Sequence, residues 1–286
     1  MRYFFISDVH GHQHRYERLF EAISKEAPDV VLLGGDLLPA AGRSAASRFP
    51  LVNDFVAEYL AAQFTELRKE MGEAYPDVCI ILGNDDPRCI EERLLDAQYA
   101  DLWHYLHMRC SRQGDTLLYG YNYVPPTPFQ FKDWERYDVS RYVEPGSVSP
   151  EEGRRSVMVD AMETRYATIQ QDLDTLTGDA DVSRAVMLFH APPYNTALDR
   201  AALDGRSVDH VPLDVHVGSV AIRKFILARS PRVTLHGHIH ESASITGKWK
   251  EQLGATWCIS AAHNGHELAL VRFDPAVPEA ATRELL

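Results

Sequence analysis

The chain has 286 residues, a length that fits one large domain or a domain with an elaborated insert. Its 45% hydrophobic and 24% charged residues are ordinary for a soluble globular enzyme. The formal net charge of −12 argues against a general nucleic-acid or anionic-membrane binder, because neutralising phosphates requires clustered Lys and Arg. A nucleotide substrate stays open, since metal ions supply positive charge locally.

Cysteine spacing and hydropathy indicate the compartment. The four cysteines show neither C-x-x-C spacing nor a disulfide framework. The sequence contains no run of about 18 apolar residues, so no membrane span is predicted. A cleaved leader is not expected either, because Asp8 and His10, singled out below, lie too near the first residue. We therefore expect a cytoplasmic protein without a membrane partner.

The first third of the chain alternates predicted strands and helices. Residues 3–6 form an apolar run typical of a buried parallel strand, and apolar residues at helical spacing then predict a helix that Pro28 stops. A strand over 30–33, a helix over 53–71 and a strand over 78–82 follow. This order is typical of right-handed βαβ units in a layered α/β fold.

The middle of the chain is an aromatic and proline-rich insert at about 116–150. We predict a strand over 116–124 and then a long ordered loop or flap, and long loops in compact enzymes are usually functional. The alternative is a cover over an exposed sheet edge or a subunit contact. Residues 1–286 are expected to form a single domain that carries this insert.

Further elements are predicted after the insert. Apolar spacings of three and four indicate one amphipathic helix over 156–177, which could also serve a homo-oligomer contact. A strand over 186–189 follows, then a helix that Ser219 caps and a strand over 233–235. The runs 257–259 and 268–273 predict antiparallel strands closing a second sheet, with a hairpin turn at Asn264-Gly265 between His263 and His266.

Metal-type ligands occur in five patches, each directly after one of these apolar runs: Asp8-Val9-His10-Gly11, Gly34-Gly35-Asp36, Gly83-Asn84-Asp85-Asp86, His190-Ala191-Pro192-Pro193 and His236-Gly237-His238-Ile239-His240. Strand ends of α/β sheets are where sites are usually built. The patches offer seven first-choice ligands: Asp8, His10, Asp36, Asn84, His190, His238 and His240. Seven is too many for one ion and suits two ions that share a bridging carboxylate.

The ligand types and their spacing favour transition metals. Asp8 and His10 alternate by one residue, as do His238 and His240, so we expect each pair to project from one side of an extended strand end. The mixed oxygen and nitrogen set suits Mn, Fe, Zn, Ni or Co better than Ca or thiol-selected metals. Taken singly, GGD and GND are turn sequences. The ordered set, each member after an apolar run, is poorly explained by chance.

The ordered set D-V-H-G, G-G-D, G-N-D, H-A-P-P and G-H-I-H resembles the calcineurin-like metallophosphoesterase superfamily, whose pattern is D-x-H, G-D-x-x, G-N-H-[DE], a lone H and G-H-x-H. The motifs span residues 8–240. The segments around 190–199 and 216–219 and the sequence GHIHES resemble a prokaryotic branch of small predicted phosphoesterases. The resemblance implies an α/β (α+β, four-layer) fold: a β-sandwich of two mixed sheets flanked by helices.

The resemblance also implies ligands and a reaction. One ion would be held by Asp8, His10, Asp36 and His240, and the other by Asp36, Asn84, His190 and His238, with Asp36 bridging. The implied enzyme is a dinuclear metal-dependent hydrolase of a small phosphodiester or phosphomonoester. A metal-bridging hydroxide would attack phosphorus in line with the leaving oxygen. Manganese is the cation we expect to support an assay.

One position departs from the family pattern. Asp85 stands where the family commonly has a His that touches the phosphate or protonates the leaving group. An ionised Asp85 would repel a phosphate and a protonated one could donate to it, and both alternatives stay open. His216 and His12 are the other candidate proton donors, and Tyr194 and Asn195 are further candidate substrate-binding residues. Turnover is expected to require good leaving groups unless such a residue supplies the proton.

Other functions compete with this interpretation. A protein phosphatase is one alternative, and a nuclease is another, although a nuclease predicts a basic groove that the acidic chain gives little reason to expect. A binding scaffold that keeps the fold without catalysis is a third. The seven filled ligand positions speak against the scaffold, and only Asp85 favours it. Metal content would discriminate the enzyme from the scaffold, since a scaffold need not retain two ions.

Overall fold

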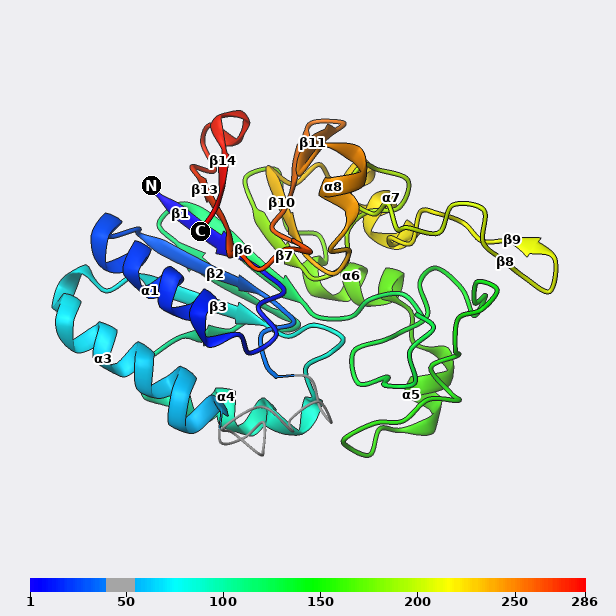
Figure 1. Cartoon of the computed structure of the whole chain (residues 1–286), viewed down its shortest axis with the longest axis horizontal. Helices are drawn as coiled ribbons and strands as arrows, with labels where there is room; N and C mark the ends of the chain where they lie inside the picture. The colour runs from blue at the N-terminus through cyan, green and yellow to red at the C-terminus, as the bar shows by residue number, and fades with distance from the viewer. Residues whose placement is uncertain (40–54) are drawn as a thin grey trace.

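The computed structural model describes residues 1–39 and 55–286. Two six-stranded sheets pack face to face, with helices on their outer faces (Figure 1). In the first sheet β1 to β4 run parallel, while β13 and β14 add antiparallel strands beyond β1. Its spatial order is β14 (Thr282–Leu285), β13 (Ala269–Phe273), β1 (Tyr3–Ile6), β2 (Val30–Gly34), β3 (Asp77–Ile81) and β4 (His104–Tyr105). The expected four-layer sandwich of mixed sheets is confirmed.

The second sheet has parallel central strands and antiparallel edges. Its order is β11 (Lys250–Leu253), β12 (Thr256–Ser260), β10 (Val233–His236), β7 (Val186–Phe189), β6 (Thr116–Tyr121) and β5 (Arg109–Gln113). The predicted antiparallel pairing of 257–259 with 268–273 is wrong. The first run lies in β12, parallel to β10, whereas the second continues into β13 of the other sheet. Turn residues at 264–265 could not distinguish a hairpin from a crossing between two packed sheets.

The strands are apolar on both faces because both faces are covered. In β1, Tyr3 and Phe5 point into the core between the sheets, whereas Phe4 and Ile6 pack on the helical side. All four side chains are fully buried. This two-sided burial explains why these strands read as continuous apolar runs without alternation.

Helices cover the outer faces of both sheets (Figure 1). Three of the predicted helices are present within the described residues: α1 ends at a left-handed Ala27 before Pro28, a π-helical segment continues into α3, and Ser219 caps α7 by accepting from the Ile222 N–H. Residues 53–54 of the predicted second helix lie outside the described part. The main helices are α1 (Gln13–Glu26), the π-helix Phe55–Leu60, α3 (Ala61–Met71), α4 (Glu91–Tyr99), α6 (Ile169–Thr177) and α7 (Val220–Arg229).

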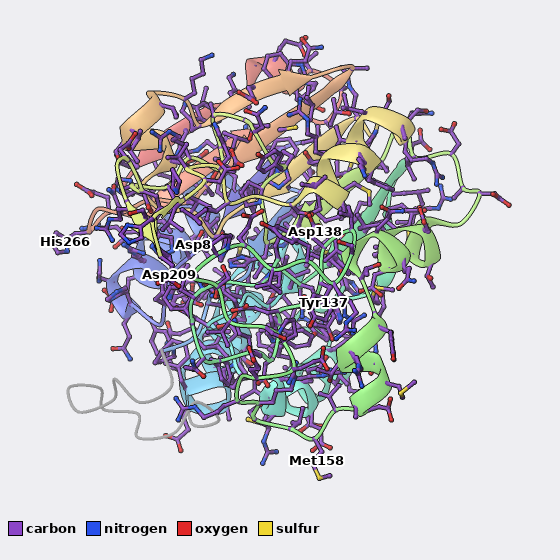
Figure 2. The ribbon with its side chains drawn as sticks, turned by 90° about the vertical axis from the view of Figure 1, so that its right-hand side faces the viewer. Asp8, Tyr137, Asp138, Met158, Asp209 and His266 are labelled. Carbon is purple, nitrogen blue, oxygen red and sulfur yellow. The ribbon has the colours of Figure 1, made fainter. Side chains whose placement is uncertain are left out.

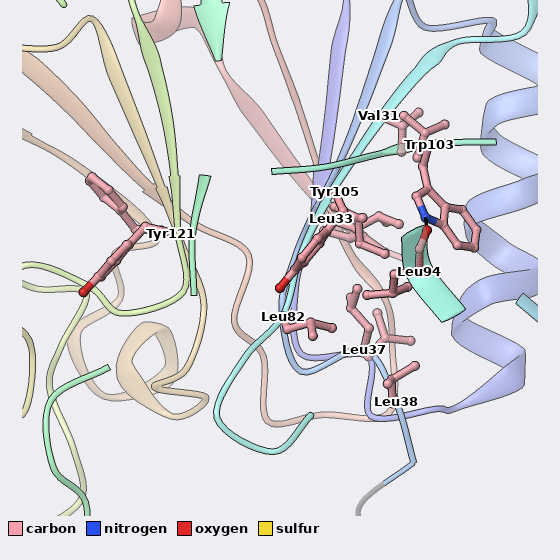
Figure 3. Packing of buried hydrophobic residues seen from close by; sticks show 14 of the residues in the cluster. Val31, Leu33, Leu37, Leu38, Leu82, Leu94, Trp103, Tyr105 and Tyr121 are labelled. Carbon is pink, nitrogen blue, oxygen red and sulfur yellow. Dashed lines mark hydrogen bonds between the residues drawn. The ribbon is translucent and has the colours of Figure 1, made fainter. Parts of the chain in front are cut away.

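The smaller elements complete the description. They are α5 (Ala161–Tyr166), α8 (Ser242–Thr246), the hairpin β8 (Ser207–Val208) with β9 (Val211–Pro212), and 3-10 turns at Gly72–Ala74, Arg88–Ile90 and Pro278–Ala280. Across residues 1–39 and 55–286, no helix combines the length and the apolar character needed to span a membrane. Figure 3 shows Leu37, Leu82 and Leu94 packed together near the ends of β2 and β3.

The single helix predicted over 156–177 is wrong. The segment forms α5 and α6, which are separated at Ala167 and Thr168. Thr168 is extended and caps α6 through a reciprocal capping box: its hydroxyl accepts from the Gln171 N–H, and the Gln171 side chain accepts from the Thr168 N–H. Met162 of α5 is 63% exposed, so the apolar stripe is not buried along its length. The T-x-x-Q signal for a new helix start was present in the sequence.

The insert after β6 is tied to the body by two carboxylates, of which Asp133 is buried and Asp138 is half-buried. Asp133 accepts hydrogen bonds from the Arg88 N–H at 2.6 Å and from the Ser156 N–H at 2.8 Å. Asp138 accepts from the Ser219 hydroxyl at 2.5 Å and from the N–H of Val220, at the start of α7. Figure 2 shows Asp138 in the middle of the loop-rich face. The segment is therefore an ordered loop anchored at both of these contacts.

An aromatic cluster beneath the insert holds a histidine in its neutral form. The ring of His107 lies 4.9 Å from that of Trp134 and 5.3 Å from that of Tyr123, centroid to centroid. Its Nδ1 accepts a hydrogen bond from the Asn122 N–H at 3.1 Å. Burial, and then the charge of Arg136, hold the pKa of His107 well below its ordinary value.

The free energy of unfolding should therefore decrease as the pH falls below about 6.5, by at most about 1.4 kcal/mol per pH unit from this group. Stability decreases in this direction because, as the pH falls, His107 takes up a proton in the unfolded chain before it does so in the folded protein. Urea titrations between about pH 7.5 and pH 5.5 measure the slope. It should flatten in His107→Gln and persist in His104→Gln, since His104 is exposed. An unchanged slope in His107→Gln would contradict this expectation.

Candidate metal centre

The seven predicted ligands all lie in segments that directly follow β1, β2, β3, β7 and β10. Their backbone differs from the expectation. Asp8, His10, Asp36 and His238 have φ angles of 57°, 50°, 52° and 72°, so they are left-handed rather than extended. The predicted extended backbone at these strand ends is therefore wrong, although Asp8 and His10 do converge in one ligand group. Such strained backbone persists where the surrounding structure fixes it, and it concentrates at functional sites.

The first ligand group comprises Asp8, His10, Asp36 and His240. Each offers one ligand atom, and these atoms all lie within 4.8 Å of one another. The Nε2 atoms of His10 and His240 approach to 3.1 Å, and His240 Nε2 lies 3.2 Å from Asp8 Oδ1. Two ring nitrogens at this distance require a proton or a cation between lone pairs that would otherwise face each other.

The second ligand group comprises Asp36, His190 and His238, again with ligand atoms within 4.8 Å of one another. Asn84 joins it, since its Oδ1 lies 3.2 Å from His190 Nε2, and the same Nε2 lies 3.3 Å from Asp36 Oδ2. His190 Nδ1 is 2.8 Å from the Gly34 carbonyl oxygen, which accepts its proton and so directs Nε2 to the site. Asp36 belongs to both groups.

The charges and one orphaned atom fit divalent cations. Asp8 Oδ2 is buried and has no hydrogen-bond partner among the described residues. Burial opposes ionisation of Asp8, but the hydrogen bond and charge of His240, together with the charges of His190 and His10, outweigh it and hold the pKa of this carboxyl well below its usual range. Burial likewise opposes ionisation of Asp36, but His190 lowers its pKa to about 2. Two buried carboxylates that stay ionised among imidazoles form a donor set suited to two transition-metal ions.

Asp86 was not among the predicted site residues, and in the structure it joins two of the ligand loops. It is fully buried, and its carboxylate accepts from the N–H groups of Leu37 at 3.0 Å, Leu38 at 2.9 Å and Gly83 at 2.9 Å. These bonds fix the loop of Asp36 against that of Asn84. The second Asp of the G-N-D-D patch was the available signal. Gly83 is required at this contact, because a Cβ there would lie 2.2 Å from an Asp36 carboxylate oxygen.

Asp85 borders the first group, whereas His12 lies at the surface. The side chain of Asp85 is 42% exposed, and its Oδ2 is 3.6 Å from His10 Nδ1. The Asp85 N–H donates to Asp36 Oδ1 at 2.8 Å. Burial and then the charge of Asp36 raise the pKa of Asp85. His12 is exposed at the start of α1, and its ring lies beside that of His14, with centroids 5.6 Å apart.

The three other predicted site residues gather around a carboxylate that the prediction did not include. Asp199 is fully buried and accepts from His216 Nδ1 at 2.7 Å and from the N–H of Asn195 at 2.9 Å. The rings of Tyr194 and His216 meet edge to face at 6.1 Å. His216, Tyr194 and Asn195 therefore form one local structure. No spacing in the sequence pointed to Asp199.

The two-sheet fold and the paired ligand groups define the metallophosphoesterase class. The chain belongs to the calcineurin-like phosphoesterase family, whose model matches residues 1–242.

Other comparisons agree on the fold. Over 61 residues, 21% of this chain, the sequence is 44% identical to the uncharacterized protein MJ1162 of Methanocaldococcus jannaschii, and the match spans 24% of that protein. The crystal structure of TT1561 of Thermus thermophilus has a TM-score of 0.57 at 16% identity, covering 99% of this chain and 98% of that one. Another solved structure, at 18% identity and with the same coverage, has a TM-score of 0.61. At these identities the solved structures show the fold alone.

Proposed function

We propose that the protein hydrolyses a small phosphodiester or phosphomonoester in a reaction that depends on two divalent transition-metal ions. The observation that carries this proposal is the presence of Asp36 in both ligand groups, which supports two cation sites next to each other. Adjacent cations that share a carboxylate suit in-line displacement at phosphorus. The net charge of −12 favours a small substrate over a nucleic acid.

Several residues would hold the metal ligands of such a site in position. When bound, the two ions would lower the pKa of water and neutralise charge on the phosphate. Asp36 sets the spacing of the two sites, and Asp86 fixes the loop of Asp36 against that of Asn84. The Gly34 carbonyl orients His190, and Asp8 orients His238 by accepting its backbone N–H at 2.9 Å. Because these side chains are held before substrate arrives, little reorganisation is needed during the reaction.

A non-catalytic binding scaffold is the second candidate, and Asp85 is the observation that favours it. The carboxylate stands beside His10 at 3.6 Å, in a place where a substrate phosphate would meet negative charge. The ligand groups favour the enzyme instead, since a scaffold has no requirement for two complete cation sites. A protein phosphatase or nuclease has no comparable support in the described residues.

Hydrolysis of an aryl phosphodiester and an aryl phosphomonoester tests the proposal. The metal is stripped, the rate is measured, and Mn²⁺ is then restored. We expect activity only after Mn²⁺ is returned, and the ratio of diester to monoester rates would assign the substrate class. If protein that binds two ions per chain hydrolyses neither ester with any divalent metal, the proposed enzymatic function is overturned and the scaffold alternative is favoured.

A further inference from the structure

We propose that His216, oriented by the buried carboxylate of Asp199, protonates the leaving oxygen of the substrate. This inference rests on the proposed phosphoester hydrolysis and assigns the proton donor that the Asp85 position lacks. His216 would act as a catalytic residue, and Asp199 as its positioning residue.

The carboxylate of Asp199 is the organising group of this part of the structure. It is fully buried and accepts four hydrogen bonds of 3.1 Å or less that converge from two loops. Three come from the backbone N–H groups of Asn195 at 2.9 Å, Thr196 at 2.9 Å and Gly218 at 3.1 Å. The fourth comes from His216 Nδ1 at 2.7 Å. The three backbone N–H groups occupy the carboxylate as an acceptor, and the imidazole Nδ1 is its fourth donor.

This bond determines which nitrogen of His216 is available. Because Nδ1 carries the proton donated to Asp199, Nε2 is left to exchange a proton with a ligand. The His216 side chain is 25% exposed, whereas Asp199 is completely covered. Tyr194 supports the ring from its edge and is itself held by a 2.6 Å hydrogen bond to Asp214. The arrangement fixes the tautomer through Nδ1 and leaves the imidazole ring partly exposed.

The segments that carry His216 and Asp199 are each fastened to a histidine-bearing ligand segment. On one side, the Ser219 N–H donates to the Pro192 carbonyl at 2.9 Å, two residues after His190. On the other, the N–H of Ala202 donates to Glu241 at 3.1 Å, and Glu241 directly follows His240. Asp199 lies between these anchors in the chain. Each member of the pair therefore lies in a segment that is fastened to a segment carrying a predicted metal ligand.

The other two candidate donors are less suited to this role. Asp85 is directed at the ligand group, with its Oδ2 3.6 Å from His10 Nδ1 and its backbone N–H donated to Asp36 Oδ1. His12 is exposed, and no described carboxylate lies within hydrogen-bonding distance of its ring. An imidazole without an orienting partner does not keep one nitrogen directed at the substrate.

The proposed step conserves atoms and charge. The oxygen of a water molecule forms a bond to phosphorus and gives up a proton to solvent. The bond from phosphorus to the leaving oxygen breaks, and its electron pair goes to that oxygen. The doubly protonated His216 transfers its Nε2 proton there, which releases a neutral alcohol or phenol, and the imidazole recovers a proton from solvent. The net reaction adds one water across the ester.

Leaving-group dependence tests this assignment. In His216→Gln, kcat should fall by about 100-fold or more on an alkyl phosphoester, whose leaving oxygen needs a proton. It should change little on a nitrophenyl ester, which leaves as a stable anion. The control is His210→Asn at the exposed tip of the β8–β9 hairpin, which should leave both rates unchanged. Equal losses on both esters, or no loss on either, would overturn the assignment. If the wild-type protein hydrolysed neither the alkyl nor the nitrophenyl ester, the proposed function itself would be contradicted.

A second measurement does not depend on turnover. Nitrogen-15 NMR of histidine-labelled protein without metal, recorded at a pH high enough to leave the imidazole neutral, should show the His216 proton on Nδ1. Asp199→Asn should mix or reverse the tautomers and reproduce the leaving-group dependence of His216→Gln. A wild-type proton on Nε2 would overturn the role of Asp199. If Asp199→Asn does not fold, the wild-type tautomer and the His216→Gln rates still decide the matter.

Discussion

Replacing Asp36 with Asn should weaken binding of both metal ions and reduce phosphoester hydrolysis by more than about 100-fold. Loss of a partner outside the ligand shell already costs about 10–100-fold in metal affinity or activity, and Asp36 offers an oxygen to both sites. The amide is neutral, so it removes the charge that two cations share. It also leaves His190 without the carboxylate that, against the effect of burial, raises its pKa to about 10.

Metal content and Mn²⁺-dependent activity measure this effect together. Asp77→Asn is a matched control, because Asp77 is an exposed residue at the opposite end of β3 from Asn84. The control should bind both ions and keep its rate. If Asp36→Asn retained two ions per chain and its activity, the shared-carboxylate arrangement would be refuted.

The positions of the ligand segments were predictable from the sequence, and their local geometry was not. Apolar runs with both faces buried identified β1, β2, β3, β7 and β10, and the carboxyl ends of parallel strands meet along one edge of a sheet. The prediction failed at the backbone of Asp8, His10 and His238. Those residues adopt positive φ because loops from both sheets converge there, which no short window of sequence records.

Contacts between distant segments account for the other gaps. Asp199 orients His216 from 17 residues away, and Asp138 caps α7 from 81 residues away, each through a single short side chain. A lone Asp between apolar runs has the same appearance whether it faces solvent or a remote N–H group. The break between α5 and α6, in contrast, has a local signal in the sequence, because the capping residues Thr168 and Gln171 mark a helix start. The apolar periodicity across the break predicts one continuous helix instead.

Replacing Glu135 with Gln should lower the free energy of unfolding by about 3–5 kcal/mol, because it leaves a buried charge without its partner. The side chains of Glu135 and Lys132 form an ion pair that is fully buried within the insert. Thr127 completes it: its N–H donates to the Glu135 carboxylate at 2.7 Å, and its carbonyl accepts from Lys132 Nζ at 2.9 Å. Burial raises the pKa of Glu135 and lowers that of Lys132, so each charge depends on the other.

Urea denaturation checks this expectation, with the exposed Glu152→Gln as the control for loss of a negative charge. Replacing both partners, Lys132→Met with Glu135→Leu, should recover most of the stability, since no buried charge is then left unpaired. An unchanged midpoint in Glu135→Gln would show that the pair is not buried in solution. Asp133 and Asp138 flank Glu135 and fasten the insert to Arg88, four residues after the predicted ligand Asn84, and to Ser219, at the start of α7. We therefore expect metal affinity to fall in Glu135→Gln and to return in the double variant.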